Sequence, residues 1–457
     1  MTARWSRSGK GSAAVAKPLV AIVGRPNVGK STLLNRLAGH RWAIVEDFPG
    51  TTRDRIYADI SHDDREFTIV DTGGLEMSPG TNLARQVKAQ VEMAIVEADA
   101  ILFMVDTGEG LTAGDEEVAA ALRCSGKPLL LVANKAETRR RRDNAVEFYR
   151  LGLGEPLTIS AYHGRGVMEL LEGLMPLLPQ GTQEPAGEPM MRMAIVGRPN
   201  VGKSMLLNAI VGQERALVTE IPGTTRDALD TPWLFQEQPV LLIDTAGLRR
   251  RGHISPGVER YSMLRAMRAI GRADVAILVI EALSGIAAQD LHIAGFVQDA
   301  YKGIVVVVNK WDLVEQPDPA SYIAYLRNKF RFIPYAPVIF TSALHGTGVD
   351  GVLDAAYTVY QERLNEPPAD SLRKVVEEAL TSHHPPSRGG RTLQVFSTHQ
   401  VQVNPPTFMF RVNDPRLLHF SYQRYLENRL RDAFGFRGTP VRLLFKGRGR
   451  KASPPGR

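Results

Sequence analysis

The chain has 457 residues and a mass of 50.3 kDa, which at roughly 150 residues per domain predicts about three domains. A hydrophobic share of 44% excludes wholesale disorder. The single cysteine, Cys124, cannot form an internal disulfide, which excludes a disulfide-stapled secreted fold and favours a reducing cytoplasm. No apolar run approaches the ~20 residues that span a bilayer, so we expect no membrane partner.

The net charge of +7 is concentrated at the C-terminal end. Residues 371–457 contain 16 lysines and arginines and 5 acidic residues, whereas the rest of the chain contains 40 and 44. This asymmetry predicts a polyanionic partner, with nucleic acid as the first candidate and a merely solvated tail as the alternative. Residues 1–18 are basic and lack an apolar stretch, which predicts a flexible tail; a transit peptide is the alternative.

An internal repeat organises the chain. The sequence GRPNVGKS occurs at Gly24–Ser31 and again at Gly197–Ser204, at an offset of 173. The same offset relates PGTTRD at Pro49–Asp54 to PGTTRD at Pro222–Asp227. A period this long predicts two complete domains in tandem.

Short apolar runs alternate with helical stretches in both copies. We expect strands at 19–23, 67–70, 101–105 and 129–133, with counterparts at 193–196, 240–243, 275–280 and 304–308. Continuous apolar strands separated by helices predict an α/β fold, in which a parallel sheet carries helices on both faces. Three prolines and two glycines in 178–192 mark a linker.

The pattern changes after residue 364, where Asn365–Pro368 breaks the chain. A helix over 371–382, strands over 393–397 and 408–412, a helix over 422–434 and a strand over 441–445 predict a third domain of order α-β-β-α-β. The expected parts are a basic tail (1–18), a first domain (19–178), a linker (179–192), a second domain (193–364), a third domain (365–446) and a basic tail (447–457).

Both copies of GRPNVGKS match the pattern of a phosphate-binding loop, and each lies between a predicted strand and a predicted helix. In such a loop backbone N–H groups face the β-phosphate, Lys30 or Lys203 neutralises β- and γ-oxygens, and Ser31 or Ser204 ligates Mg²⁺. The expected nucleotide contacts in the loops are Gly24, Asn27, Val28, Gly29, Lys30, Ser31, Thr32, Gly197, Asn200, Val201, Gly202, Lys203 and Ser204.

Asp71 and Asp244 each end an apolar strand, where a carboxylate can hold Mg²⁺ through water. The glycines Gly74 and Gly247 follow, and a backbone N–H there can sense the γ-phosphate. The pattern predicts a nucleotide-dependent switch.

Thr52 and Thr225 lie between the two phosphate motifs of each copy. Their hydroxyl and carbonyl oxygens could bind the γ-phosphate and Mg²⁺ when the loop orders. Thr51 and Thr224 compete for this role, and a solvated threonine-rich loop is the alternative.

Base selection in the second copy is assigned to Asn309, Lys310 and Asp312. The Asp312 carboxylate can accept from the N1–H and the exocyclic amine of guanine, a pattern that adenine cannot present, so we expect GTP and not ATP. Ser342 and Ala343 follow the predicted strand 338–341, and a backbone N–H there could bind guanine O6.

In the first copy the corresponding residues are Asn134, Lys135 and Glu137, with Ser160 and Ala161 as the O6-binding pair. Glu137 is one methylene longer than Asp312. It can still accept two donors, but the affinity or selectivity for guanine there is open.

Hydrolysis requires an oriented water, and Leu75 and Leu248 cannot position one. Asn27 and Asn200 could ligate a monovalent cation through a side-chain oxygen; the alternative is that each caps its loop. The sequence therefore predicts slow intrinsic turnover, as in GTPases that await a trigger.

The two GRPNVGKS loops, the two TTRD segments, NKAE with NKWD and the basic C-terminal region resemble the Der family of double GTPases, also called EngA. Asn404–Phe408 and Ser421–Asn428 resemble that family's KH-like third domain. The resemblance implies a GTP-hydrolysing factor in large (50S) subunit assembly, whose nucleotide state controls binding to pre-ribosomal rRNA. It also implies K⁺-stimulated hydrolysis, with Asn27 and Asn200 at the cation positions. We expect a cytoplasmic monomer.

The sequence departs from the family pattern at Glu137 in place of Asp, at Met205 after Ser204, and in the 18-residue N-terminal extension. Gly435–Gly438 (GFRG) resembles a KH nucleic-acid loop but lies between a helix and the final strand, so we do not take it as the RNA clamp. Arg139–Arg142 and Arg249–Arg251 are read as solvated faces, with RNA or third-domain contact as the alternative for the second run. A module that binds GTP in one copy and barely hydrolyses it stays a competing hypothesis.

Overall fold

The computed structural model describes residues 17–38, 56–63, 65–73, 83–179, 190–212, 230–236, 238–245, 262–385, 387–388 and 390–447. The described chain forms two compact units, one built mainly from the first copy of the repeat and the other mainly from the second copy with the C-terminal region. Among the described helices, none combines the length and apolar character needed to cross a lipid bilayer.

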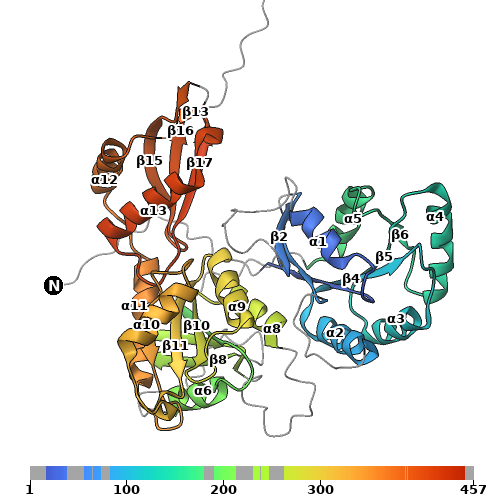
Figure 1. Ribbon diagram of the computed structural model, residues 1–457, viewed down its shortest axis with the longest axis horizontal. Coiled ribbons are helices and arrows are strands. Elements are labelled where there is room, and N and C mark those ends of the chain that lie inside the picture. Colours follow the sequence, from blue (N-terminus) through green and yellow to red (C-terminus); the bar gives the residue numbers. More distant parts are fainter. Residues whose placement is uncertain are drawn as a thin grey trace, which may run out of the picture. The chain divides into compact units, whose positions relative to one another are not determined.

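The first copy forms a six-stranded sheet of order β2-β3-β1-β4-β5-β6. Its strands are β1 (Leu19–Val23), β2 (Tyr57–His62), β3 (Arg65–Asp71), β4 (Ala100–Asp106), β5 (Leu129–Asn134) and β6 (Leu157–Thr158). Its helices are α1 (Lys30–Ala38), α2 (Leu83–Glu97), α3 (Ala113–Ser125), α4 (Arg139–Asn144), η1 (Ala145–Leu151), α5 (Val167–Leu174) and η2 (Met175–Leu177). Figure 1 shows α1 and α5 on one side of β4, and α2 and α3 on the other.

Alternation along β1 explains this three-layer arrangement. Val20 and Ile22 belong to one buried cluster with residues of α1 and α5, whereas Ala21 and Val23 belong to a second cluster with residues of α2, α3 and η1. Successive side chains of a strand point to opposite faces, so a continuous apolar strand needs a helical layer on each. The predicted α/β fold with helices on both faces is confirmed.

The second copy repeats the sheet in the order β12-β11-β10-β7-β9-β8. Its strands are β7 (Met191–Val196), β8 (Thr231–Phe235), β9 (Gln238–Ile243), β10 (Val275–Glu281), β11 (Gly303–Asn309) and β12 (Val338–Phe340). Its helices are α6 (Lys203–Val211), α8 (Ser262–Arg272), α9 (Ala288–Asp299), η4 (Trp311–Leu313), α10 (Pro319–Lys329) and α11 (Val349–Arg363).

One edge strand in each sheet departs from the expected parallel arrangement. β2 pairs with β3, and β8 with β9, in the antiparallel sense, while the other strand pairs in both sheets are parallel. The cause is the connection: His62 is followed by Arg65 of β3 after only two residues, and so short a link can join only antiparallel neighbours.

The C-terminal region consists of α12 (Ala369–Ser382), β13 (Ser387–Arg388), β14 (Arg391–Thr392), β15 (Val395–Gln402), β16 (Thr407–Val412), η5 (Pro415–Leu417), α13 (Phe420–Phe434) and β17 (Arg442–Gly447). Its sheet has the order β15-β16-β17, with β16 and β17 parallel. Apolar residues of α12 and α13 form one buried cluster with Phe408 and Phe410 of β16. The order α-β-β-α-β matches the prediction, and the small β13–β14 hairpin is an addition to it.

The GFRG segment packs against the second copy. Gly438 N–H donates to Tyr335 O at 3.0 Å, and Gly438 O accepts from Ile304 N–H at 2.7 Å. Phe436 is fully buried, and its N–H donates to Glu362 Oε2 at 2.7 Å. Arg363, 1% exposed, reaches Thr439 Oγ1 at 2.9 Å from the end of α11. The segment is therefore part of the junction between the second copy and the C-terminal region, and the expectation that it is not an RNA clamp stays a prediction.

Candidate nucleotide-binding sites

The phosphate loops depend on glycine at two positions in each copy. Gly24 has φ 149° and Gly29 has φ 100°. A Cβ on Gly24 would lie 2.4 Å from Met104 O, and one on Gly29 would lie 2.3 Å from Asn134 Nδ2. The matching distances at Gly197 and Gly202 are 2.3 Å and 2.1 Å. Both loops therefore require glycine for backbone conformation and for space.

Each loop lysine turns back onto its own loop. Lys30 is 7% exposed, and its Nζ donates to Gly24 O at 2.9 Å and Arg25 O at 2.8 Å. Burial lowers the pKa of the Lys30 ammonium, an effect that the nearby Asp71 opposes. Lys203 repeats these bonds, to Gly197 O at 2.7 Å and to Arg198 O. Each lysine ammonium is thus held beside the loop, where phosphate oxygens would bind.

Two of the predicted magnesium ligands, Ser31 and Asp71, are adjacent in the first copy. Ser31 Oγ donates to Asp71 Oδ2 at 2.5 Å, and Asp71, 1% exposed at the end of β3, also accepts from Gly73 N–H at 2.8 Å. In the second copy Ser204 Oγ is buried and has no hydrogen-bond partner within the described part of the chain. A hydroxyl beside a carboxylate, and an unsatisfied buried hydroxyl, fit the oxygen ligation that Mg²⁺ prefers.

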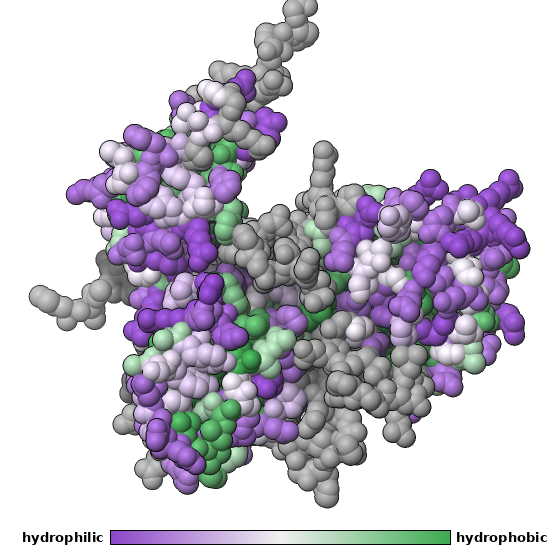
Figure 2. All heavy atoms as spheres, in the orientation of Figure 1, coloured by the Kyte–Doolittle hydropathy of each residue, from purple (hydrophilic) through white to green (hydrophobic). Residues whose placement is uncertain are grey.

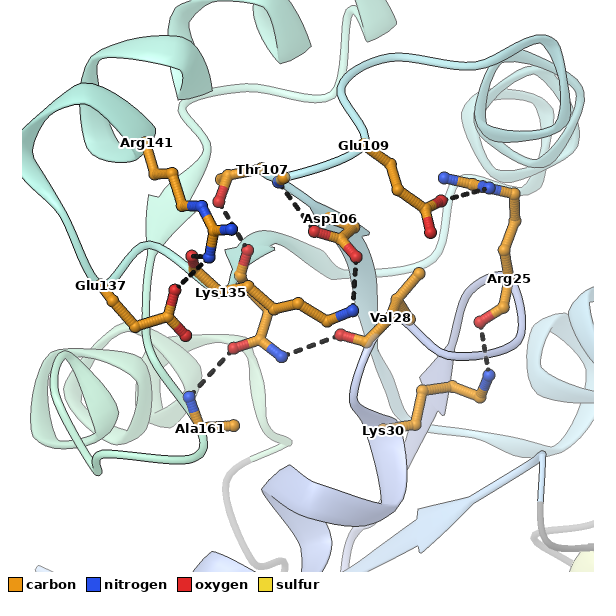
Figure 3. A network of polar contacts seen from close by, with 12 residues as sticks. Arg25, Val28, Lys30, Asp106, Thr107, Glu109, Lys135, Glu137, Arg141 and Ala161 are labelled. Carbon is orange, nitrogen blue, oxygen red and sulfur yellow. Dashed lines mark hydrogen bonds and ion pairs between the residues drawn. The ribbon is translucent and has the colours of Figure 1, made fainter.

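Asn134 and Asn309 each connect the phosphate loop to the loop that follows the last strand of the copy, β6 in the first copy and β12 in the second. Asn134 Nδ2 donates to Val28 O at 2.8 Å, and its Oδ1 accepts from Ala161 N–H at 2.9 Å. Asn309 makes the same two bonds, to Val201 O at 2.8 Å and from Ala343 N–H at 3.0 Å. In each copy these bonds connect the phosphate loop to the loop that holds the expected O6-binding residues. Figure 3 shows the bonds at Val28 and Ala161 in the first copy.

The residues expected to bind guanine O6 already have internal acceptors. Ser160 N–H donates to Arg165 O at 2.9 Å, and Ser342 N–H donates to Thr347 O at 3.0 Å. With the Ala161 and Ala343 N–H groups bonded to the asparagines, an O6 contact would need a shared N–H. The O6 role stays a prediction.

The lysines after these asparagines lie at the carboxyl ends of the strands β5 and β11. Lys135 Nζ is 2.6 Å from Asp106 Oδ2, and Lys310 Nζ is 2.6 Å from Glu281 Oε1. The hydrogen bond from Lys310 lowers the pKa of the Glu281 carboxyl. Both lysines have positive φ, at 64° and 62°, so each leaves its strand in a sharp left-handed turn.

The two base-selecting carboxylates differ in their surroundings. Glu137 Oε2 accepts from Arg141 Nη1 at 2.6 Å, and Ser160 Oγ lies 3.4 Å from Oε1. Burial raises the pKa of Glu137, but the hydrogen bond from Arg141 and further contacts outweigh this and lower it. Asp312 lies 3.9 Å from His345 Nε2.

Sequence reasoning missed the ion pairs that hold the phosphate loops. Arg25 Nε donates to Asp115 Oδ1 at 2.9 Å, and Arg198 Nε lies 2.7 Å from Asp290 Oδ2. Both carboxylates are fully buried at the start of a helix, and burial raises the pKa of Asp290. The signal was present, because Asp115 and Asp290 occupy equivalent places in the repeat.

The remaining predicted residues fall into three groups. Asp244 follows β9 at φ 60°, and its N–H donates to Asp230 Oδ1 at 2.9 Å. Asn27 and Asn200 are exposed at φ 65° and 64°, and Thr32 is exposed on α1. The others lie outside the described residues: Thr52, Gly74, Thr225 and Gly247.

The fold and the paired sites define a tandem P-loop GTPase with an additional α+β region at the C-terminus. A family model described as "50S ribosome-binding GTPase" matches residues 19–135 and again 192–310. A second model, "KH-domain-like of EngA bacterial GTPase enzymes, C-terminal", matches residues 368–446.

Curated relatives match along nearly the whole chain. The GTPase Der of Thermomicrobium roseum is 52% identical over 95% of this chain and 97% of that relative, and the GTPase Der of Chloroflexus aggregans is 49% identical over 95% and 99%. The chain belongs to the Der family. It is a GTPase, which converts GTP and water to GDP and phosphate.

Solved structures match parts of the chain. Era of Aquifex aeolicus bound to GDP.AlF4− is 25% identical, with a TM-score of 0.30, and covers 55% of this chain and 86% of that one. The G domain of the T. maritima iron transporter FeoB is 25% identical, with a TM-score of 0.26, and covers 38% and 99%.

Proposed function

We propose that this GTPase acts in assembly of the large ribosomal subunit, and that its nucleotide state controls binding to pre-ribosomal rRNA. The charge of the C-terminal region carries the proposal: residues 387–447 contain ten lysines and arginines and three acidic residues. Arg391, Arg411, Arg416 and Lys446 are exposed there. Such a surface favours a phosphate backbone, and the match to a 50S ribosome-binding GTPase model supports the large subunit as target.

The roles of the nucleotide-binding residues are proposed from the sequence motifs and from the loop geometry described above. The loop N–H groups with Lys30 or Lys203 bind the β- and γ-phosphates, and Glu137 or Asp312 selects guanine. Mg²⁺ would supply positive charge between the phosphates, and a monovalent cation, K⁺, would add to it. The proposed magnesium ligands are Ser31, Thr52, Asp71, Ser204, Thr225 and Asp244; the proposed potassium ligands are Asn27 and Asn200.

The contribution of this chain to hydrolysis is mainly electrostatic. Phosphoryl transfer passes through a loose transition state, whose charge lies on the transferred oxygens and the leaving oxygen. The ammonium of Lys30 is buried and held by two loop carbonyl oxygens, which supports a role for it in stabilising that charge with little reorganisation. We propose that Thr52, Gly74, Thr225 and Gly247 complete the two sites around the γ-phosphate.

We further propose domains at 19–178, 193–364 and 365–446, and a cytoplasmic monomer. The single cysteine supports a reducing compartment.

Co-sedimentation tests the proposed function. Purified full-length protein is centrifuged with large or small ribosomal subunits in GDP, GTP or a non-hydrolysable GTP analogue, at two salt concentrations. We expect binding to the large subunit in one nucleotide state, weakened at high salt because phosphate contacts release counterions. Arg411→Glu with Lys446→Glu should weaken it, whereas Arg373→Glu on α12 should not. Absence of large-subunit binding in every nucleotide state would reject the proposal.

A further inference from the structure

Arg141 stands apart within the run of four arginines on α4. Its Nη1 donates to Glu137 Oε2 at 2.6 Å and to Lys135 O at 3.3 Å, so it contacts both residues that flank Ala136 in the base-selecting segment. Arg140, Arg141 and Arg142 are all exposed, so the contact with Glu137, and not burial, distinguishes Arg141. Figure 3 shows the Arg141 guanidinium turned from α4 toward Glu137 and Lys135, while Figure 2 shows mainly hydrophilic residues over α4.

This pair is not an ordinary ion pair along a helix face. α4 begins at Arg139, with Thr138 as its N-cap, so Glu137 precedes the helix although it stands four residues before Arg141. α4 has only six residues, and Arg141 lies in both its first and its last turn, so the helix dipole does not favour a positive charge at this position. The helix therefore gives no reason for an arginine at this position, whereas the carboxylate of Glu137 does.

Glu137 needs external support more than its counterpart does. Its additional methylene adds a rotatable bond, and fixing such a bond on nucleotide binding costs conformational entropy. Arg141 holds one carboxylate oxygen and Ser160 lies near the other, while the backbone O of Glu137 accepts from Arg165 Nη1 at 3.3 Å. Asp312 in the second copy is shorter, and Gln316 stands four residues after it.

We propose that Arg141 is a positioning residue for guanine selection in the first site: it orders the Glu137 carboxylate so that its free lone pairs face the N1–H and exocyclic amine of the base. The inference rests on the proposed role of Glu137 in guanine binding. Each carboxylate oxygen has two lone pairs, so Oε2 can accept from Arg141 and from the base together. Arg141 itself does not touch the nucleotide.

The test compares nucleotides that differ by one donor. Dissociation constants for GDP and IDP are measured by fluorescence titration with full-length protein carrying Lys203→Ala, which silences the second site. IDP lacks the exocyclic amine, so the IDP-to-GDP ratio of dissociation constants reports the carboxylate contact. Arg141→Ala should weaken GDP binding by roughly fivefold and lower this ratio, because a partly exposed ion pair contributes up to about that factor. Arg142→Ala is the matched control and should change neither.

A double-mutant cycle distinguishes positioning from a general effect on α4. Glu137→Asp shortens the carboxylate beyond the reach of Arg141, so adding Arg141→Ala to it should have less effect on the ratio than in the Glu137 protein. Arg141→Lys should restore part of the ratio, because it retains the charge. An unchanged or increased ratio in Arg141→Ala would overturn the inference. An unchanged ratio in Glu137→Ala would instead reject the proposed guanine role of Glu137 itself.

Discussion

Gly29 and Asn134 show how closely the two halves of the first site are packed. Gly29 lacks a Cβ at the place where the Asn134 amide passes on its way to Val28 O. The same relation holds between Gly202 and Asn309. Each glycine therefore allows the loop backbone to turn and also leaves room for the asparagine that connects the phosphate loop to the expected base-binding loop.

Gly29→Ala should weaken GDP binding to the first site by more than tenfold. The new methyl group both occupies a left-handed backbone position and meets Asn134 Nδ2, and strain of this kind costs ~1–3 kcal/mol. Gly126→Ala is the control, since Gly126 also has positive φ, at 63°, but no atom lies within 4 Å of its Cβ position. Titration of both variants in a Lys203→Ala background checks this; equal losses would mean that only backbone strain matters.

The loop serines give opposite expectations without ligand. Ser204→Ala removes a buried hydroxyl that has no partner among the described residues, so the stability of the nucleotide-free protein should be unchanged or higher. Ser31→Ala breaks the bond to Asp71 and should cost about 1 kcal/mol. Melting in EDTA, and again with GDP and Mg²⁺, separates the effects: each variant should lose most of the Mg²⁺-dependent stabilisation of the copy that carries the change, while the other copy keeps its own. Retention of it by Ser204→Ala would contradict the proposed ligand role.

At the scale of elements, the sequence predicts best what is buried on both sides. β4 is fully buried along its length and appears as a continuous apolar run, whereas β2 alternates buried and half-buried positions and includes Asp59 and His62. Such an edge strand carries too few apolar residues to stand out, so its antiparallel pairing was missed. In the same way the motifs predicted Lys30, Asp71 and Asn134, but not Arg141 or Asp115. Arg141 belongs to an arginine run that resembles a solvated face. Asp115 lies 90 residues from its partner Arg25, so only its equivalence to Asp290 in the repeat marks it.

The Lys310–Glu281 pair joins the ends of β11 and β10, and its contribution should depend on pH. Because the hydrogen bond lowers the Glu281 pKa, the stabilisation is complete above the ordinary value of 4.5 and disappears as pH falls through the lower folded pKa. Glu281→Gln should therefore cost up to about 1 kcal/mol at pH 7 and progressively less as the pH falls from 4.5 to 3. Urea unfolding across this range measures it, with the exposed Glu315→Gln as control. A cost that persists undiminished at pH 3 would contradict the ionic origin.

At the scale of the whole molecule, Arg363 connects the second GTPase fold to the C-terminal region. Its guanidinium is buried, with bonds to Tyr301 O at 2.9 Å, Thr439 Oγ1 at 2.9 Å and Asn404 Oδ1 at 2.5 Å. Arg363→Ala should cost roughly 3 kcal/mol, because it leaves these buried acceptors unsatisfied. Calorimetry should then resolve separate unfolding transitions for the second GTPase fold and for the C-terminal region. In the control, the exposed Arg373→Ala, these two parts should still unfold together. If they also unfold together in Arg363→Ala, other contacts are sufficient to couple them.

The repeat itself leads to an expectation about turnover. Both sites present the same loop lysine bonded to two loop carbonyls and the same asparagine bridge, so the geometry gives no reason for one site to be inert. Lys30→Ala and Lys203→Ala should each retain single-turnover GTP hydrolysis from the intact site, and the double variant should lose it. If one single variant loses all hydrolysis, the other copy binds GTP without hydrolysing it. The difference between Glu137 and Asp312 would not explain such a result, because those carboxylates are proposed to contact the base and not the γ-phosphate.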